Sequence, residues 1–350
     1  MSFFRPQTDW PKGSITRFQH RSTALESNPW GDPVARELSV YLPPGYSESG
    51  TPYLALWDLA AYTNSGPGHL NWRNQGENLP ARLDRLIGQG VMDPVVVVFP
   101  DCYTSLGGNQ YVNSPSVGHY ADYLNQELVP LVSANLNVVD SRDGRALFGK
   151  SSGGYGALYL GMNFPETWGA VASHAGDMGF EWVYQKDFPL ACEVLTKFEG
   201  DYDGFIRAFW RKNQLSGRDY AVLMVLAMAA SYDPDPAQPS RIRLPFNLRT
   251  CEIDPERWKC WQAADPLNML EHKADALRSL HGLYIDVGTY DQYRIQYGTR
   301  RFVDRLEELD VEHFFEEFEG THSAIDWRLD HSLPYLARAL KTAQSAPINA

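Results

Sequence analysis

Ala146-Leu147-Phe148-Gly149-Lys150-Ser151-Ser152-Gly153-Gly154-Tyr155-Gly156-Ala157 decides the fold of this chain. The apolar start of the stretch predicts a buried strand, and the residues after it predict a helix. A serine at such a junction, in the pattern Gly-x-Ser-x-Gly, is typical of a nucleophile elbow. Gly149 and Gly153 carry no side chain, so strand and helix can pass close together beside the strained serine. We therefore predict Ser151 as a nucleophile and the amide of Ser152, at the helix N-terminus, as an oxyanion donor.

The same residues also satisfy the pattern of a phosphate-binding loop, read from Gly144 to Ser151. In a phosphate loop the strand precedes the first glycine, and the residues between the glycines form an open loop. Here the apolar strand lies between Gly144 and Gly149. The context therefore favours the elbow.

Charge and composition exclude several classes of function. The chain has 350 residues and a formal net charge of −12, which argues against nucleic acid or an anionic membrane as its main partner. No apolar run is long enough to span a membrane, and the N-terminal residues lack the layout of a secretory signal. The four cysteines are widely spread and match no metal-binding spacing, so we expect reduced thiols in a cytoplasmic protein.

Strands and helices alternate on both sides of the elbow. This alternation predicts one α/β domain over 1–350 with a mostly parallel central sheet flanked by helices. The lead-in up to Asp32 is expected to be irregular. The expected strands are 37–42, 53–57, 95–99, 146–148, 170–173, 283–287 and 313–318, and the expected helices are 79–87, 120–131, 157–162, 297–309 and 329–340.

The regular alternation stops over 181–276, which we interpret as a helical cap inserted in the sheet domain. The segment contains a predicted helix at 219–230 and a tryptophan-rich stretch, and it is too apolar for a disordered linker. Its aromatic side chains either line an apolar substrate pocket or pack the cap onto the sheet, and the sequence favours packing. These aromatics are Phe180, Trp182, Tyr184, Trp210, Trp258 and Trp261.

A serine nucleophile needs a base and an orienting acid, which follow it in the order acid, then histidine. His322 lies in a loop after the last expected strand, where it could reach back over the serine. Asp291 lies in the loop after the preceding strand and can accept the Nδ1–H bond of the imidazole. The rival acid is Asp286, within the strand itself. His174, after the strand that follows the elbow, is the second choice for the base and a candidate to line the substrate pocket.

The second oxyanion donor should come from the loop after strand 53–57. Only a main-chain N–H is required there, so the side chain does not decide the position. Ala60 is the candidate donor. No metal or organic cofactor is expected, because the chemistry needs only the triad and these two amides.

Five segments together resemble the "Putative esterase" family of α/β-hydrolases, which includes enterochelin esterases, feruloyl and acetylxylan esterases, S-formylglutathione hydrolases and mycobacterial mycolyltransferases. The segments are 40–46, 94–101, 149–157, 288–291 and 320–322, and the enterochelin esterase-like branch is the most similar. The resemblance implies the α/β-hydrolase fold, with Ser151, Asp291 and His322 as the triad.

The resemblance implies hydrolysis of a small-molecule carboxylic ester through an acyl-enzyme intermediate. An acyltransferase would use the same triad but transfer the acyl group to an alcohol. A serine peptidase of this fold and a non-catalytic binding module are further alternatives, although all three triad candidates are present. The natural ester and the oligomeric state are left open by the sequence.

Overall fold

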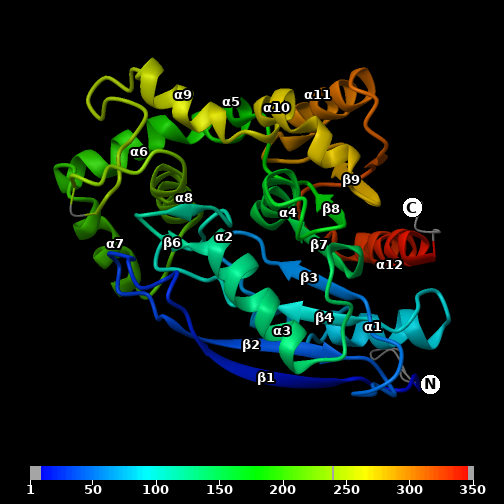
Figure 1. The fold of residues 1–350 in the computed structure, drawn as a ribbon. Helices are drawn as coiled ribbons and strands as arrows, with labels where there is room; N and C mark the ends of the chain where they lie inside the picture. Colours follow the sequence, from blue (N-terminus) through cyan, green and yellow to red (C-terminus); the bar gives the residue numbers. More distant parts are fainter. Residues whose placement is uncertain (1–8, 239, 346–350) are drawn as a thin grey trace.

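The computed structural model describes residues 9–238 and 240–345. Its central sheet has eight strands in the order β1-β2-β4-β3-β7-β8-β9-β10 (Figure 1). The strands are β1 (Ser14–Arg21), β2 (Ala35–Leu42), β3 (Ala55–Leu59), β4 (Val96–Phe99), β7 (Arg145–Lys150), β8 (Ala170–His174), β9 (Gly282–Gly288) and β10 (Phe314–Phe318), and a small hairpin adds β5 (Asn113–Ser114) and β6 (Gly118–His119).

Twelve α-helices are assigned in the described residues: α1 (Leu79–Gly88), α2 (Tyr120–Asp122), α3 (Val129–Asn135), α4 (Ser152–Asn163), α5 (Phe180–Val183), α6 (Phe188–Leu195), α7 (Tyr202–Arg211), α8 (Gly217–Tyr232), α9 (Pro255–Ala263), α10 (Pro266–Arg278), α11 (Ile295–Glu308) and α12 (Leu329–Ser345). Short 3-10 segments are η1 (Gly66–Leu70), η3 (Arg142–Gly144), η4 (Gln185–Asp187), η5 (Thr196–Phe198) and η6 (Asp326–Arg328), and η2 (Tyr123–Leu128) is a π-helical turn between α2 and α3.

Most of the sheet is parallel, which confirms the prediction from the alternating pattern. β1 pairs with β2, and β2 with β4, in antiparallel register, whereas all pairs from β4 to β10 are parallel. The central strands are buried throughout because helices cover both faces of the sheet. The carboxyl ends of the parallel strands therefore meet at one edge, where loops can gather functional side chains.

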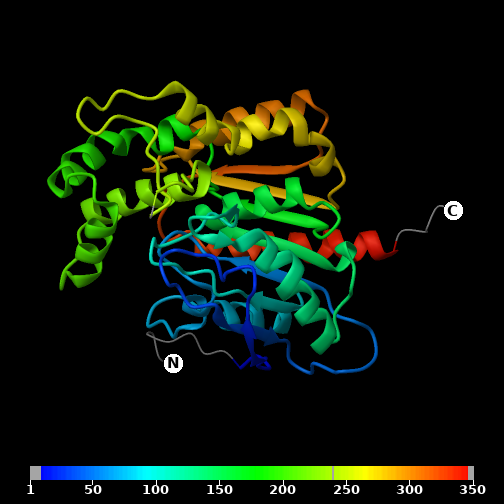
Figure 2. The same cartoon turned by 60° about the vertical axis from the view of Figure 1, so that its left-hand side comes forward.

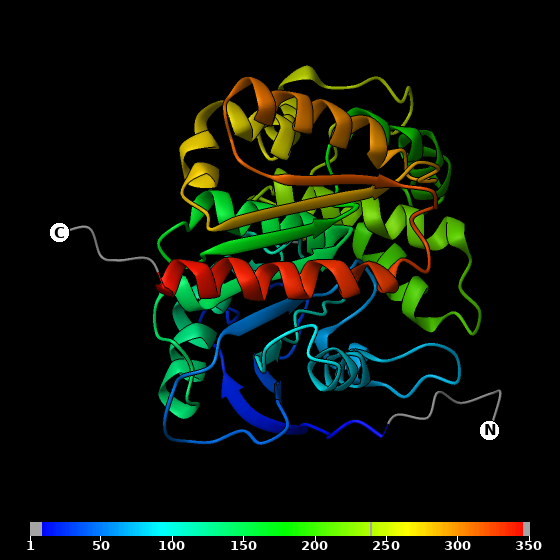
Figure 3. The same cartoon turned by 90° about the vertical axis from the view of Figure 1, so that its right-hand side faces the viewer.

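The helices form a layer on each face of the sheet. α1 and α12 cover one face of the sheet (Figure 3). On this face, leucines of both helices pack on Leu56, Val97 and Phe148. α3, α4, α10 and α11 cover the opposite face, around Trp57 and Leu147. These two apolar layers fix the sheet between them and hold its carboxyl edge in place.

The predicted cap, 181–276, contains helices α5 to α10, except that α5 starts one residue earlier and α10 ends two residues later. Helices α5 to α9 project beyond one end of the sheet (Figure 2). They share an apolar cluster that also includes residues of α4, β9 and β10. α10 instead packs on α4 and α11, beside the sheet. Buried aromatics are concentrated in this cluster: Phe180, Tyr184, Trp258 and Trp261 are buried, whereas Trp210 is exposed.

The expectation of an irregular lead-in is wrong for 14–21, which form the edge strand β1. β1 pairs along its whole length with β2, from Ser14 opposite Leu42 to Arg21 opposite Ala35. Its side chains are mostly polar and partly exposed, with Ile15 and Phe18 as the apolar exceptions. An edge strand of this kind lacks the apolar alternation by which strands are recognised.

Candidate active site

The elbow has the strained geometry that its sequence predicts. Ser151 adopts φ 57° and ψ −125° between β7 and α4. A Cβ atom on Gly153 would stand 1.8 Å from the carbonyl oxygen of Leu59, and one on Gly149 would stand 2.5 Å from the carbonyl carbon of Gly153. Both glycines are therefore required by close backbone approaches, which bring β7, α4 and the end of β3 together beneath the serine.

His322 and Asp291 come together at the same edge of the sheet. His322 follows β10, Asp291 follows β9, and His322 Nδ1 lies 2.7 Å from Asp291 Oδ2. The other carboxylate oxygen of Asp291 accepts a hydrogen bond from the main-chain N–H of Tyr293 at 2.8 Å. The side chains of Asp291 and His322 are almost fully buried, which excludes water from their hydrogen bond.

Two further contacts fix the position of His322. Its main-chain N–H donates to Oε1 of Gln292 at 2.9 Å, and the ring of Tyr293 packs edge-on against the imidazole with 4.8 Å between the centroids. Both partners follow Asp291 directly in the chain. The loop after β9 therefore carries Asp291 and also holds the loop that carries His322 in place.

A cavity of about 480 Å³ is shared by Ser151, Ser152 and His322. One wall is formed by 61–63, after β3, and the opposite wall by the cap residues Val183, Tyr184, Ala221 and Met224. Of the six aromatic residues considered as pocket residues from the sequence, Tyr184 is the one that lines this cavity. The other buried aromatics pack the cap, as the sequence favours.

Asp177 is a site residue that the sequence analysis did not single out. Ser151 Oγ donates to its Oδ1 at 3.3 Å. Its Oδ2 accepts from Ser152 Oγ at 3.2 Å, from Gln110 Nε2 at 3.2 Å and from Tyr184 Oη at 3.0 Å. Burial raises the pKa of the Asp177 carboxyl, and the nearby His322 ring and these hydrogen bonds oppose that effect. The hydroxyl group of Ser151 thus lies against a buried carboxyl group.

One signal in the sequence could have pointed to Asp177. It follows β8, which neighbours the elbow strand β7 in the sheet. Polar side chains just after neighbouring parallel strands meet at the carboxyl edge of the sheet. Because Asp177 comes only three residues after the end of β8, the sequence could have indicated it as a site residue.

His174 does not line the Ser151 cavity. Its Nδ1 lies 2.8 Å from Oδ1 of Asp286, and its Nε2 lies 2.8 Å from Oγ of Ser332. Arg328 Nε also donates to Asp286 Oδ2 at 2.7 Å. All four side chains are buried. This second Ser–His–Asp arrangement joins β8, β9 and α12, and His174 also lines a neighbouring cavity of about 280 Å³. Asp286, the rival acid, is therefore bonded to His174 and Arg328 and not to His322.

Ala60, the predicted second oxyanion donor, lies against the elbow helix. Its carbonyl oxygen accepts a hydrogen bond from Tyr111 Oη at 2.6 Å, and a Cβ on Gly153 would stand 3.0 Å from the same oxygen. Ala61, and not Ala60, lines the Ser151 cavity. The loop after β3 is thus held beside the elbow by Tyr111.

Residues 9–238 and 240–345 contain no group of three or more histidine, cysteine or acidic residues placed to hold a metal ion. The same part of the chain contains no helix with the length and apolar character needed to cross a bilayer. The four cysteines are free thiols.

The sequence matches the model of the family described as "Putative esterase" over residues 34–333. Among curated proteins, YbbA of Bacillus subtilis, described as uncharacterized, is 26% identical over 155 residues, which cover 42% of this chain and 58% of that protein. The iron(III) enterobactin esterase of Escherichia coli is 45% identical over 51 residues, which cover 15% of this chain and 13% of that protein. This chain therefore matches less than two thirds of the length of either relative.

Solved structures resemble nearly the whole chain. A ferulic acid esterase superimposes with a TM-score of 0.60 at 18% identity, covering 94% of this chain and 99% of that one. At this identity the likeness concerns the fold. It confirms the α/β-hydrolase fold that the elbow and the alternating strands predict.

Proposed function

Because this chain belongs to the "Putative esterase" family, we propose that it is a serine carboxylic ester hydrolase in which Ser151, His322 and Asp291 form the catalytic triad. The observation that carries the proposal is the 2.7 Å contact between His322 Nδ1 and Asp291 Oδ2, beside a cavity that His322 shares with the strained Ser151. A nucleophile, a base and an orienting acid in this arrangement suit acyl transfer to water.

Acylation begins when Ser151 Oγ turns from Asp177 towards His322. The Nε2 atom of His322 takes the hydroxyl proton while Oγ attacks the ester carbonyl carbon. The carbonyl oxygen becomes an oxyanion, for which we propose the amides of Ser152 and Ala60 as donors. His322 then gives its proton to the leaving alkoxide, and the acyl group remains on Ser151 as an ester.

Deacylation repeats these steps with water. His322 takes a proton from a water molecule, and the resulting hydroxide attacks the acyl carbon. The tetrahedral intermediate collapses, the carboxylic acid leaves, and the proton returns through His322 to Ser151 Oγ. Asp291 keeps the Nδ1–H tautomer and stabilises the imidazolium in both halves of the reaction.

The acyl group of the substrate is proposed to lie under the cap. Val183, Tyr184, Ala221 and Met224 form the apolar wall of the Ser151 cavity. The segment shared with the iron(III) enterobactin esterase supports a place for this chain in the enterochelin esterase-like branch. We propose a small-molecule ester as the substrate.

The proposal is tested by hydrolysis of p-nitrophenyl esters of increasing acyl length by wild type and Ser151→Ala. Turnover by the wild type should disappear in the variant, and the preferred chain length should measure the space under the cap. A fluorophosphonate should label the wild type at the peptide that contains Ser151, as located by mass spectrometry. Activity or labelling that persists in pure Ser151→Ala protein contradicts the assignment. Addition of an alcohol acceptor to the same assay separates hydrolysis from acyl transfer.

A further inference from the structure

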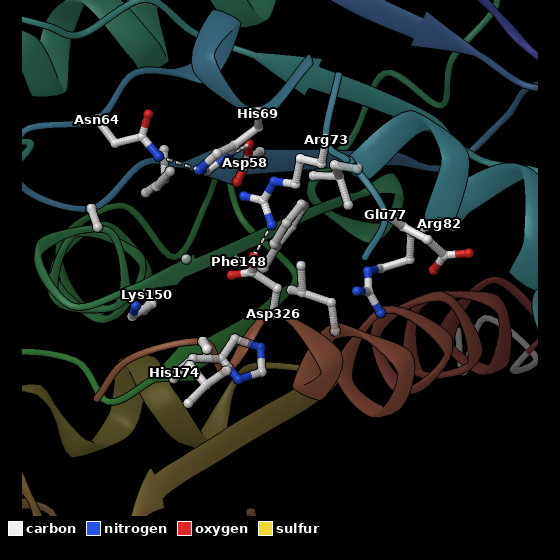
Figure 4. A pocket seen from close by; sticks show the side chains of 17 residues that line it. Asp58, Asn64, His69, Arg73, Glu77, Arg82, Phe148, Lys150, His174 and Asp326 are labelled. Carbon is white, nitrogen blue, oxygen red and sulfur yellow. Dashed lines mark hydrogen bonds and ion pairs between the residues drawn. The ribbon is translucent and has the colours of Figure 1, made fainter. Parts of the chain in front are cut away.

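A second cavity, of about 280 Å³, lies next to the Ser151 cavity, and Figure 4 shows the residues that line it. Its floor is apolar and includes Phe148 and Leu329, and charged side chains form its walls. Two residues, Ala61 and Lys150, line both cavities. Since Lys150 precedes Ser151 in the chain, the two cavities meet beside the nucleophile. We call the smaller one the Lys150 cavity.

The acidic residues around the Lys150 cavity already have cationic partners. Asp58 contacts His69, and Asp326 contacts Arg73 (Figure 4). Glu77 accepts from Arg85 Nη2 at 2.8 Å. Each of these negative charges is therefore matched by a positive one.

Lys150 is the exception among the charged residues of this cavity. Within the residues that the structure describes, its ammonium group has no hydrogen-bond or ion-pair partner within the usual distances. It is half-buried at the end of β7. Burial lowers the pKa of Lys150, and the negative charges of Asp326 and Asp291 oppose that effect. A partly desolvated ammonium without a partner gains free energy when an anion binds beside it.

The position of the cavity matches the leaving-group side of the reaction. His322 must deliver a proton to the alcohol oxygen, so the alcohol part of the ester lies on the His322 side of Ser151. Residues 324–326, which follow His322 after Ser323, line the Lys150 cavity, whereas His322 and Ser323 line the Ser151 cavity. The loop after β3, which carries the proposed oxyanion donor, forms its other side. The cap, in contrast, bounds the cavity proposed for the acyl group.

We propose that the Lys150 cavity is a leaving-group subsite, in which the Lys150 ammonium binds a carboxylate carried by the alcohol part of the ester. This inference rests on the proposed function and narrows its substrate class to esters of acidic alcohols. The apolar floor receives the carbon skeleton of the alcohol, and its hydroxyl oxygen stays next to His322 and Ser151.

The first test compares two esters with the same acyl group, 3-acetoxybenzoate and phenyl acetate. The measured quantity is the ratio of their kcat/KM values, each corrected for spontaneous hydrolysis. In Lys150→Met the ratio should fall about tenfold, the expected effect of losing one partly buried charge pair. Lys150→Arg keeps the positive charge and should keep the preference for the carboxylated ester.

Lys186→Met is the matched control for this ratio. Lys186 is also half-buried, lines the Ser151 cavity but not the Lys150 cavity, and stacks over the ring of Tyr293 at 4.6 Å. It should leave the ratio unchanged. The subsite proposal is overturned if the ratio of the two kcat/KM values is the same in wild type and Lys150→Met. It is also overturned if that ratio falls equally in Lys150→Met and Lys186→Met.

A second readout does not depend on turnover. Calorimetry with Ser151→Ala should detect 3-hydroxybenzoate binding more tightly than phenol, and adding Lys150→Met should abolish that difference. If no ester is hydrolysed but this Lys150-dependent binding is found, the subsite stands and the proposed function fails. If esters are hydrolysed but neither rate nor binding depends on Lys150, the subsite fails and the proposed function stands.

Discussion

Ser151 Oγ donates its hydrogen bond to Oδ1 of Asp177, 3.3 Å away, while the second oxygen of that carboxyl group accepts from three other side chains. Three donors fix Oδ2, so the carboxyl group cannot turn without breaking them. The hydroxyl group of Ser151, the proposed nucleophile, is therefore held by an acid other than Asp291, the proposed partner of His322. Asp177 also stands close enough to His322 for their charges to interact.

Asp177→Asn should stabilise the fold at neutral pH. Burial raises the pKa of the Asp177 carboxyl, so the ionised form of this side chain is costly in the folded state. The cost is present at pH values above the raised pKa and is absent below the ordinary value of 3.8, where the carboxyl group is protonated in both states. Urea denaturation at pH 7 and in strong acid should therefore show a larger gain at pH 7. A variant that is less stable than wild type at both pH values would contradict this argument.

Asp291→Asn should lower kcat by roughly 10³–10⁴-fold, because the imidazole loses the acceptor that sets its tautomer. The amide keeps nearly the same shape, so the free energy of unfolding should change far less than the rate. Steady-state kinetics and urea denaturation of the same preparation separate these two effects. Near-normal turnover by folded Asp291→Asn would show that a residue other than Asp291 orients the imidazole.

Gly153→Ala should destabilise the fold by at least about 3 kcal/mol. The new Cβ would stand 1.8 Å from the carbonyl oxygen of Leu59, a backbone atom that can move only with β3. Gly217→Ala is the matched control, since no atom lies within 4 Å of a Cβ built there. Urea denaturation should show a large loss for the first variant and almost none for the second. Equal stability of both variants contradicts the close packing of the elbow.

Glu127→Gln should destabilise the protein at neutral pH but not in strong acid. Glu127 accepts from the amides of Thr23 and Ala24 at 2.9 Å each, and it contacts His20 Nε2 at 2.9 Å. Burial raises the pKa of Glu127, but the hydrogen bonds from residues 20–24 outweigh it and lower that pKa to about 2.

The carboxylate of Glu127 therefore stabilises the fold fully above its unfolded-state pKa of 4.5, and the contribution is lost as the pH falls towards 2. We expect a difference of roughly 1–3 kcal/mol between wild type and Glu127→Gln at pH 7, shrinking towards zero near pH 2. Urea denaturation at several pH values measures it. Glu193→Gln removes a carboxylate from an exposed ion pair with Arg218 and should cost less than about 1 kcal/mol. A pH-independent difference for Glu127→Gln contradicts the argument.

Much of the fold could be predicted from local patterns. The buried strands are short apolar runs bounded by glycine, proline or polar residues, and the elbow is recognised by its spacing of small residues. The pairing of His322 with Asp291 could be predicted because each follows a strand near the C-terminus, and the carboxyl ends of parallel strands share one edge. In the structure, His322 Nδ1 lies 2.7 Å from Asp291 Oδ2.

Features that depend on the three-dimensional assembly could not be predicted in this way. β1 is recognised through its pairing with β2, because its own side chains are mostly polar. His174 sits beside the elbow strand, but its ring is held by Asp286 and Ser332, which lie more than one hundred residues further along the chain. The Lys150 cavity likewise combines four distant segments, and no local pattern marks it.

The order of strands in the sheet also sets the timing of activity during synthesis. Ser151 and its elbow lie at the centre of the sheet, whereas Asp291 and His322 follow β9 and β10, which complete it at one side. At typical translation rates, His322 is added roughly 10–30 s after Ser151. A nascent chain that contains the elbow still lacks Asp291 and His322. Under the proposed mechanism, a chain that stops before β9 therefore carries a serine that no base activates.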